Sequence, residues 1–146
     1  IREINGFTQN VGGQPIRVED SAVVSFKFAS GATGTHNTGY YLGRGKQSGI
    51  RIWGSHGWLR LAHLEGHPLQ WHSTKPGAPR EIQTFKYNDT REMYHLFFQD
   101  AIDAIREGKP PPITTSESLR ALRVVFAAYE AVATGRTQQI KISNPR

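Results

Sequence analysis

The sequence contains no cysteine and no long run of apolar residues. The lack of cysteine excludes disulfides, thiolate ligands for zinc and a cysteine nucleophile. The lack of cysteine does not discriminate between cellular compartments. Our default expectation is a cytoplasmic protein. A membrane-spanning helix needs about 20 consecutive apolar residues, so we expect no membrane anchor within this sequence. A chain of 146 residues is long enough for one compact domain, and we treat residues 1–146 as a single domain.

Basic residues outnumber acidic ones, giving a formal net charge of +6. Nucleic-acid binding would normally require these charges to gather into a basic patch or to alternate with aromatic residues in a binding motif. Here the lysines and arginines are scattered from Arg2 to Arg146 without a cluster. The charge pattern therefore favours a protein that does not bind nucleic acid, although a basic nucleic-acid-binding domain stays the third hypothesis.

The first 85 residues or so have the alternation and turn residues of short strands. Ser21–Ala29 is β-branched and aromatic, and Ser30-Gly31 predicts a tight turn into a second strand over Thr33–Leu42. Ile50–Trp53 and Trp58–Leu61 flank the turn at Gly54–Gly57. Further strands are predicted at Ile1–Gln9, Leu69–Ser73, Glu81–Phe85 and Gln139–Ser143. With hairpin-length connections between most of them, the strands should form a mainly antiparallel sheet.

Two helices follow the first seven strands. The apolar residues of Asp89–Glu107 recur with the period of a helix, Asn88 or Asp89 can cap its start, and Gly108 ends it. Thr114 and Glu117 have the spacing of a capping box and predict the start of a second helix that Gly135 closes. The predicted fold class is α+β: a mainly antiparallel, open-faced sheet with two helices packed on one face.

An open sheet face has to be solvated or covered by a partner. Five tryptophan and tyrosine residues belong to the predicted strands: Trp53, Trp58, Trp71, Tyr40 and Tyr41. We expect some of them to lie on the face without helices and to form a homo-oligomer contact there.

Four segments in their order and spacing resemble a known family. They are EDSAVVSFKFASGA at residues 19–32, IWGSHGWL at 52–59, AIDAIREGKPPP at 101–112, and SLRAL, AAYEA and TGR within 118–136. Together they are similar to the C-terminal domain of the glucose-fructose oxidoreductase / inositol dehydrogenase family (Gfo/Idh/MocA), over nearly the whole chain.

The resemblance implies a two-domain parent enzyme that transfers a hydride between NAD or NADP and a hydroxyl carbon, usually of a sugar or polyol. In that family the N-terminal Rossmann domain binds the cofactor. The C-terminal domain supplies one wall of the substrate cleft and, through its open sheet, the oligomer interface. We expect this chain to be such a C-terminal part, since it opens at Ile1 without an initiator Met or a leader.

The sequence departs from the complete family pattern in three motifs. It has no Gly-x-Gly-x-x-Gly, no Glu-Lys-Pro with the family's assisting lysine, and no Asp-x-x-x-His with its proton-accepting histidine. We therefore assign no catalytic, cofactor-binding or metal-binding residue here, and we expect the chain to be inactive by itself. The sequence of this chain does not reveal the substrate, the choice between NAD and NADP as cofactor, or the direction of the reaction.

Tyr40, Tyr41 and Arg44 are the candidate substrate-binding residues. The resemblance implies that the strand before the Gly43–Gly49 loop reaches the substrate cleft. Strand alternation allows only one of the two tyrosines to face it, and the sequence does not choose between them. The loop is rich in glycine and basic but lacks the spacing of a phosphate-binding loop, so an ordinary hairpin loop is favoured over a phosphate site.

The histidines do not form a metal-site pattern. His63 and His67 are four residues apart, but Gly66 and Pro68 break the helix that would bring them together. His95 has no partner acid or base at a suitable spacing and is interpreted as a surface or packing residue. A free-standing binding or scaffold protein of the same fold remains the alternative to a domain of an oxidoreductase.

Overall fold

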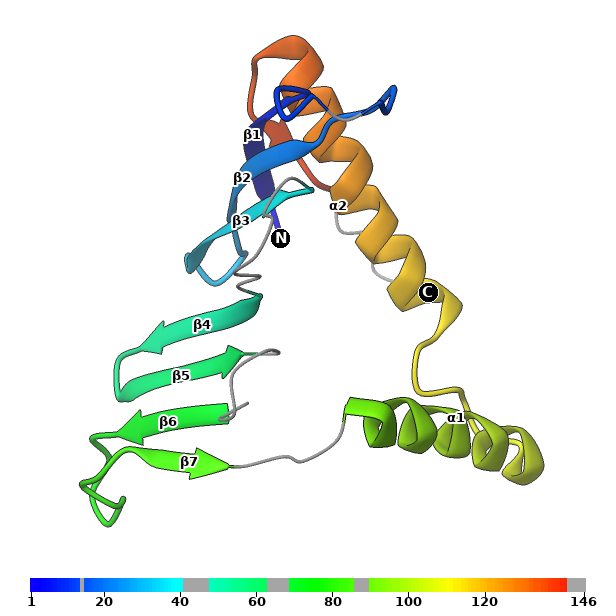
Figure 1. Ribbon diagram of the computed structural model, residues 1–146. Helices are drawn as coiled ribbons and strands as arrows, with labels where there is room; N and C mark the ends of the chain where they lie inside the picture. The colour runs from blue at the N-terminus through cyan, green and yellow to red at the C-terminus, as the bar shows by residue number, and fades with distance from the viewer. Residues whose placement is uncertain (14, 41–47, 63–68, 86–89, 142–146) are drawn as a thin grey trace. The chain divides into compact units, whose positions relative to one another are not determined.

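The computed structural model describes residues 1–13, 15–40, 48–62, 69–85 and 90–141. Within these residues, seven strands, two helices and a last short strand follow one another (Figure 1). Their bounds are β1 Glu3–Gln9, β2 Ser21–Lys27, β3 Thr33–Gly39, β4 Gly49–Gly54, β5 Gly57–Ala62, β6 Leu69–Ser73, β7 Gln83–Phe85, α1 Thr90–Glu107, α2 Thr115–Thr134 and β8 Gln138–Gln139.

The strands form two separate antiparallel sheets of four strands each. The first sheet has the order β3-β2-β1-β8, and the second has the order β4-β5-β6-β7. The chain correspondingly divides into two compact units: residues Ile1–Leu42 with Pro110–Arg146, and residues Gly43–Lys109. The first unit contains the first sheet and α2, and the second unit contains the second sheet and α1.

In the first unit α2 packs against strands β1 and β8. Ile4 of β1 is 2% exposed and Ala131 of α2 is completely buried. Along β2 the side chains of Ala22, Val24 and Phe26 are partly buried, while the residues between them are exposed. This period-2 burial is what a sheet with one covered face requires.

In the second unit the sheet is an antiparallel meander in which each strand pairs with the next one along the chain. The turn between β4 and β5 places Gly57 at φ +140°, a backbone angle that L-residues with a side chain rarely adopt. A Cβ at this position would overlap the carbonyl oxygen of His72 on β6. The sequence therefore needs glycine at residue 57 for both the turn and the close approach of β6.

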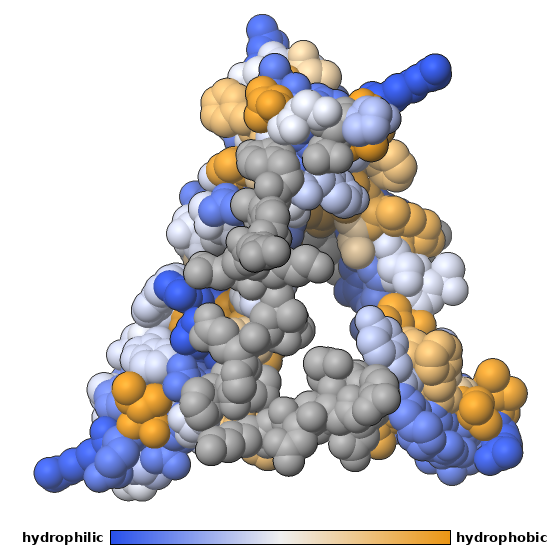
Figure 2. All heavy atoms as spheres, viewed as in Figure 1, coloured by the Kyte–Doolittle hydropathy of each residue, from blue (hydrophilic) through white to orange (hydrophobic). Residues whose placement is uncertain are grey.

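Large apolar side chains of α1 are exposed in the second unit, including Phe98 at 60% and Ile105 at 80%. The N-terminal part of α2 likewise exposes Leu119, Leu122 and Phe126. Figure 2 shows apolar surface over both helices. Both helices therefore carry apolar stripes that extend beyond what each unit covers.

The predicted helix and turn signals are confirmed where the structure describes them. Glu117 donates its backbone N–H to the Thr114 hydroxyl at 3.3 Å, and the Glu117 carboxylate accepts the Thr114 backbone N–H at 2.8 Å, which completes the capping box. Gly135 ends α2 in the left-handed conformation, and Gly31 has φ +89° in the β2–β3 turn. The Asn88 and Asp89 caps expected for α1 lie outside the described residues.

The α+β class with mainly antiparallel strands is confirmed. All eight predicted strands are present, with ends that shift by up to two residues among the described positions. The division of these strands into two sheets is a feature that the sequence patterns did not indicate.

Candidate functional site

Tyr40 lies directly after β3, at the end of the first sheet. Its backbone N–H donates to the carbonyl oxygen of Asp20 at 2.8 Å, which fixes the backbone at this point. Its side chain is 79% exposed. The structure thus presents a phenol to solvent from a fixed backbone, as a residue that contacts a ligand requires.

A second tyrosine and a carboxylate lie at the same end of the first unit. The Tyr129 hydroxyl on α2 donates to Glu19 Oε1 at 2.6 Å, although the two residues are 110 positions apart. The pKa of Tyr129 is raised, first because the phenol donates to the Glu19 carboxylate and then because of that carboxylate's charge. Tyr40 contributes a smaller electrostatic effect in the same direction. We call Glu19, Tyr40 and Tyr129 the tyrosine cluster.

Asp20, the neighbour of Glu19, holds the preceding loop in place. It is 1% exposed, and its carboxylate accepts the backbone N–H groups of Val11 at 3.1 Å and Gly12 at 2.5 Å. Asn10 also ties the loop together by donating to the carbonyl oxygens of Ile16 and Val18. A carboxylate buried with two N–H partners anchors the β1–β2 loop next to the tyrosine cluster.

Of the three candidate substrate-binding residues, only Tyr40 is described. Tyr41 and Arg44 lie outside the described residues. That only one of the two tyrosines faces the cleft therefore stays a prediction. Sequence reasoning missed Glu19 and Tyr129 because no local pattern connects a residue before β2 with one on α2.

The second sheet carries two distinct faces, which the strand register defines. On one face Trp53 lies opposite Trp58, and Arg51 lies opposite Arg60. His72 and Gln70 on β6 continue these two rows. The other face is apolar and contains Ile50, Ile52, Leu59, Leu61, Leu69, Trp71 and Phe85. We call the first of these the tryptophan–arginine face.

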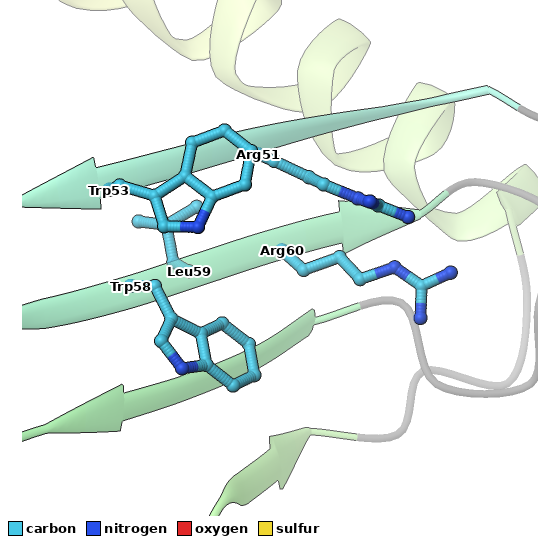
Figure 3. A pocket seen from close by; sticks show the side chains of 5 residues that line it. All are labelled: Arg51, Trp53, Trp58, Leu59 and Arg60. Carbon is cyan, nitrogen blue, oxygen red and sulfur yellow. The ribbon is translucent and has the colours of Figure 1, made fainter.

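A shallow hollow of about 190 Å³ is lined by Arg51, Trp53, Trp58 and Arg60 of the tryptophan–arginine face and by Leu59 between them on β5. Figure 3 shows the side chains of Arg51 and Arg60 extending side by side from β4 and β5 in the same direction, away from the two indoles. Trp53 is 73% exposed, so its ring is available to a ligand or partner.

The sequence contains a local signal for this arrangement. A two-residue turn at Ser55-His56 pairs Gly54 with Gly57, and counting outward pairs the two tryptophans and then the two arginines. A hairpin turn of known length fixes cross-strand partners by arithmetic alone. The pairing was therefore accessible from the sequence once the turn was located.

A second open groove, of about 550 Å³, runs between α2 and β8. Its lining combines apolar Phe126, Ala127 and Ile140 with charged Arg123, Glu130 and Lys141, and with Gln139. Its lining therefore has no single chemical character that would point to one class of ligand.

The described residues contain no group of three histidine, aspartate or glutamate side chains placed to hold a metal ion. His63 and His67 lie outside the described residues.

Among the described residues, no helix has the length and apolar character needed to cross a membrane.

Comparison with known proteins gives a match to one family model. The model, described as the oxidoreductase family, C-terminal alpha/beta domain (Gfo/Idh/MocA), matches residues 3–142. No curated protein sequence matches the chain significantly.

Solved structures share the fold at low sequence identity. An oxidoreductase domain protein from Kribbella flavida matches with TM-score 0.86 and 20% identity over 97% of this chain and 45% of its own. Levoglucosan dehydrogenase in complex with NADH and L-sorbose matches with TM-score 0.83 and 17% identity over 97% and 45%. An oxidoreductase from Agrobacterium radiobacter in complex with NAD+, L-tartaric acid and magnesium matches with TM-score 0.77 and 23% identity over 96% and 43%. The chain thus spans less than half the length of these proteins.

Proposed function

The chain belongs to the oxidoreductase (Gfo/Idh/MocA) family as its C-terminal α/β domain, and from this premise we propose that it forms part of the substrate cleft and the oligomer interface of an NAD(P)-dependent sugar or polyol oxidoreductase. The observation that carries the proposal is the family match over residues 3–142. It is supported by the shared fold with proteins solved in complex with NADH or NAD+ and small polyhydroxylated ligands. The cytoplasmic location stays a prediction.

The residues of this chain do not fit a nucleotide cofactor. A dinucleotide site needs a glycine-rich turn between a strand and a helix, so that backbone N–H groups and the helix start face the pyrophosphate. The sequence has no Gly-x-Gly-x-x-Gly, and α2 begins at the Thr114 capping box instead. We therefore assign no chemical step to the cofactor here and propose that NAD or NADP is held by another part of a longer parent.

The tyrosine cluster is the proposed contribution of this chain to substrate binding. A phenol both donates and accepts hydrogen bonds, and a carboxylate accepts them, which suits the hydroxyl groups of a sugar or polyol. Tyr40 is the exposed member, while the Tyr129 hydroxyl is engaged with Glu19 at 2.6 Å. We propose that Tyr40 contacts substrate and that Tyr129 and Glu19 are positioning residues behind it.

The second sheet is the proposed assembly surface. Trp53 is 73% exposed on the tryptophan–arginine face, and large exposed aromatic groups mark interaction surfaces more often than ordinary surface. We propose that a second copy of the chain covers this face. Multi-angle light scattering of the chain at tens of micromolar should show a dimer or larger species, and a strictly monomeric protein would contradict this part of the proposal.

Cofactor titration tests whether the nucleotide is bound by this chain or by another part of the source protein. The isolated chain is titrated with NADH while nicotinamide fluorescence is followed, and it is assayed with NAD+ and a panel of polyols at 340 nm. We expect neither saturable binding nor turnover. Activity that appears only in the full-length source protein, which should be about twice as long because a Rossmann domain is added, supports the proposal. A source protein of this length alone would favour the free-standing binding or scaffold protein instead.

Substitution in the full-length source protein tests the tyrosine cluster. Tyr40→Phe should raise KM for the preferred polyol by about tenfold, as expected for loss of one hydrogen bond of about 1.4 kcal/mol, with a smaller effect on kcat. Tyr94→Phe is the matched control, since Tyr94 is a 69% exposed tyrosine on α1 in the other unit. If both substitutions leave KM equally unchanged, the proposal that Tyr40 lines the cleft is contradicted.

A further inference from the structure

Helix α2 carries apolar side chains on two opposite sides. On the first side, where α2 packs against β1 and β8, Ala131 is completely buried and Ala128 is partly buried. On the second side Leu119, Leu122 and Phe126 are exposed, and Phe126 is 65% exposed. A surface helix needs one apolar stripe, whereas a helix that is apolar all round is normally buried. The second side of α2 is therefore suited to being covered as well.

The exposed stripe of α2 leads to the tyrosine cluster. Leu122, Phe126 and Tyr129 follow one another at positions i, i+4 and i+7, so they lie along one side of the helix. The hydroxyl of Tyr129 in turn donates its hydrogen bond to Glu19. The stripe is thus continuous with the residues to which the proposed function assigns substrate binding.

The β1–β2 loop adds a second apolar surface beside the tyrosine cluster. The carboxylate of Asp20, next in sequence to Glu19, accepts the backbone N–H groups of Val11 and Gly12. Although the loop is held by these bonds, the side chains of Val11 and Val18 are exposed. A loop that is ordered in advance loses little conformational entropy when a partner covers it. We call Val11, Val18, Leu119, Leu122 and Phe126 the docking surface.

The proposed function places a requirement on what covers this surface. Reacting atoms have to approach to within about 3.5 Å of each other, so an oxidoreductase holds its cofactor in contact with its substrate. This chain does not fit a nucleotide cofactor, so the part of the parent that holds it has to lie against a substrate bound at Tyr40. The matched solved structures contain more than such a domain, since this chain spans less than half of their length.

We propose that the docking surface is where the cofactor-holding part of the parent enzyme contacts this chain, and that this contact closes the substrate site at Tyr40. The inference rests on the proposed function and deepens it by naming the surface involved. The matching surface of the partner is apolar, because polar groups buried against these aliphatic and aromatic side chains would lose their hydrogen bonds. Covering the docking surface also excludes water from the adjacent tyrosine cluster.

Thiol labelling tests the docking, because this chain contains no cysteine of its own. Phe126→Cys is introduced into this chain and into the full-length source protein, and peptide mass spectrometry follows the labelling of that residue by a maleimide. We expect rapid labelling in this chain. In the source protein the labelling should be about tenfold slower or more, since a cysteine buried in apolar surroundings is inert.

Phe7→Cys is the matched control. Phe7 belongs to the same unit and is 82% exposed, but strand alternation places it on the face of β1 opposite to the buried Ile4. It should be labelled at the same rate in both proteins. Leu122→Cys, at a second position of the docking surface, should repeat the result of Phe126→Cys. Circular dichroism checks that each variant is folded.

Three outcomes would overturn the inference and leave the proposed function standing. Rapid labelling of Phe126→Cys in both proteins would show that this side of α2 stays open in the parent. Slow labelling in this chain already would show that another element of the same chain covers it. Protection in the source protein that disappears on dilution would assign the surface to a second copy. A source protein no longer than this chain would instead overturn the proposed function itself.

Discussion

The two sheets of this chain have the same number of strands and the same antiparallel pairing, yet they differ in how their side chains are covered. In the first unit α2 packs on β1 and β8, and Ile4 and Ala131 are buried between these elements. In the second unit the described contacts of the sheet are those among its own strands, and Ile50 and Ile52 are each 52% exposed. Similar secondary structure therefore supports a covered sheet in one unit and an exposed one in the other.

Under the proposed function, this difference suits the two units to different tasks. A covered sheet with an anchored loop can hold a side chain such as Tyr40 in a fixed place, as a ligand site requires. An exposed sheet with tryptophan on its surface gains free energy when a partner covers it.

Truncating one isoleucine in each sheet compares the two units directly. Ile4→Ala should lower the free energy of unfolding by about 3 kcal/mol, the usual cost of losing a fully buried isoleucine side chain. Ile52→Ala should lower it by less than about 1 kcal/mol, because half of that side chain is already in water. Urea denaturation at low micromolar concentration measures both. Equal losses would mean that the second sheet is as well covered in solution as the first.

Removing the buried carboxylate of the first unit should have the next largest effect. Asp20→Ala leaves the backbone N–H groups of Val11 and Gly12 without their acceptor, at a cost of about 2 kcal/mol. Asp100→Ala on α1 removes an exposed carboxylate and should cost less than about 0.5 kcal/mol. Hydrogen exchange of the β1–β2 loop reports the same change locally. Unchanged loop protection in Asp20→Ala would show that the carboxylate does not anchor the loop.

Within the second unit, two glycines of one hairpin should respond differently to alanine. Gly57→Ala forces a side chain into φ +140° and against the His72 carbonyl group, and should cost about 1–2 kcal/mol. Gly54→Ala should be close to neutral, because its Cβ would meet only the Gly57 carbonyl oxygen at an ordinary 3.8 Å. Thermal unfolding of both variants is the measurement. A similar loss from both would contradict the local strain at residue 57.

The smallest expected effect concerns the tyrosine cluster and pH. The pKa of Tyr129 is raised in the folded chain by its hydrogen bond to Glu19, so its stabilising contribution is complete below the ordinary tyrosine pKa and is lost as pH rises through the raised value. Spectroscopic titration of tyrosinate should show one late-titrating group that Glu19→Gln shifts to lower pH. Glu81→Gln, in the other unit, should leave the curve unchanged. A curve identical in all three proteins would contradict the hydrogen bond.

Local signals were sufficient for most of the secondary structure. The alternation along Ser21–Ala29, the Ser30-Gly31 turn and the Thr114/Glu117 capping box each involve residues a few positions apart. The end of a strand or helix depends on such neighbours, so the sequence predicted these elements closely. The candidate site was only partly accessible: Tyr40 came from its position in the resemblance, whereas Glu19 and Tyr129 meet across 110 residues.

The sequence by itself determined the α+β class, the order of the elements and the hairpin that pairs Arg51 with Arg60, because periodicity and turn length are local properties. Tertiary structure alone decided that the strands divide into two sheets, that α2 covers β1 and β8, and that Tyr129 reaches Glu19. These arrangements depend on which apolar faces meet over long separations in the chain. Many pairings satisfy the same local pattern, and only the packing of whole faces selects among them.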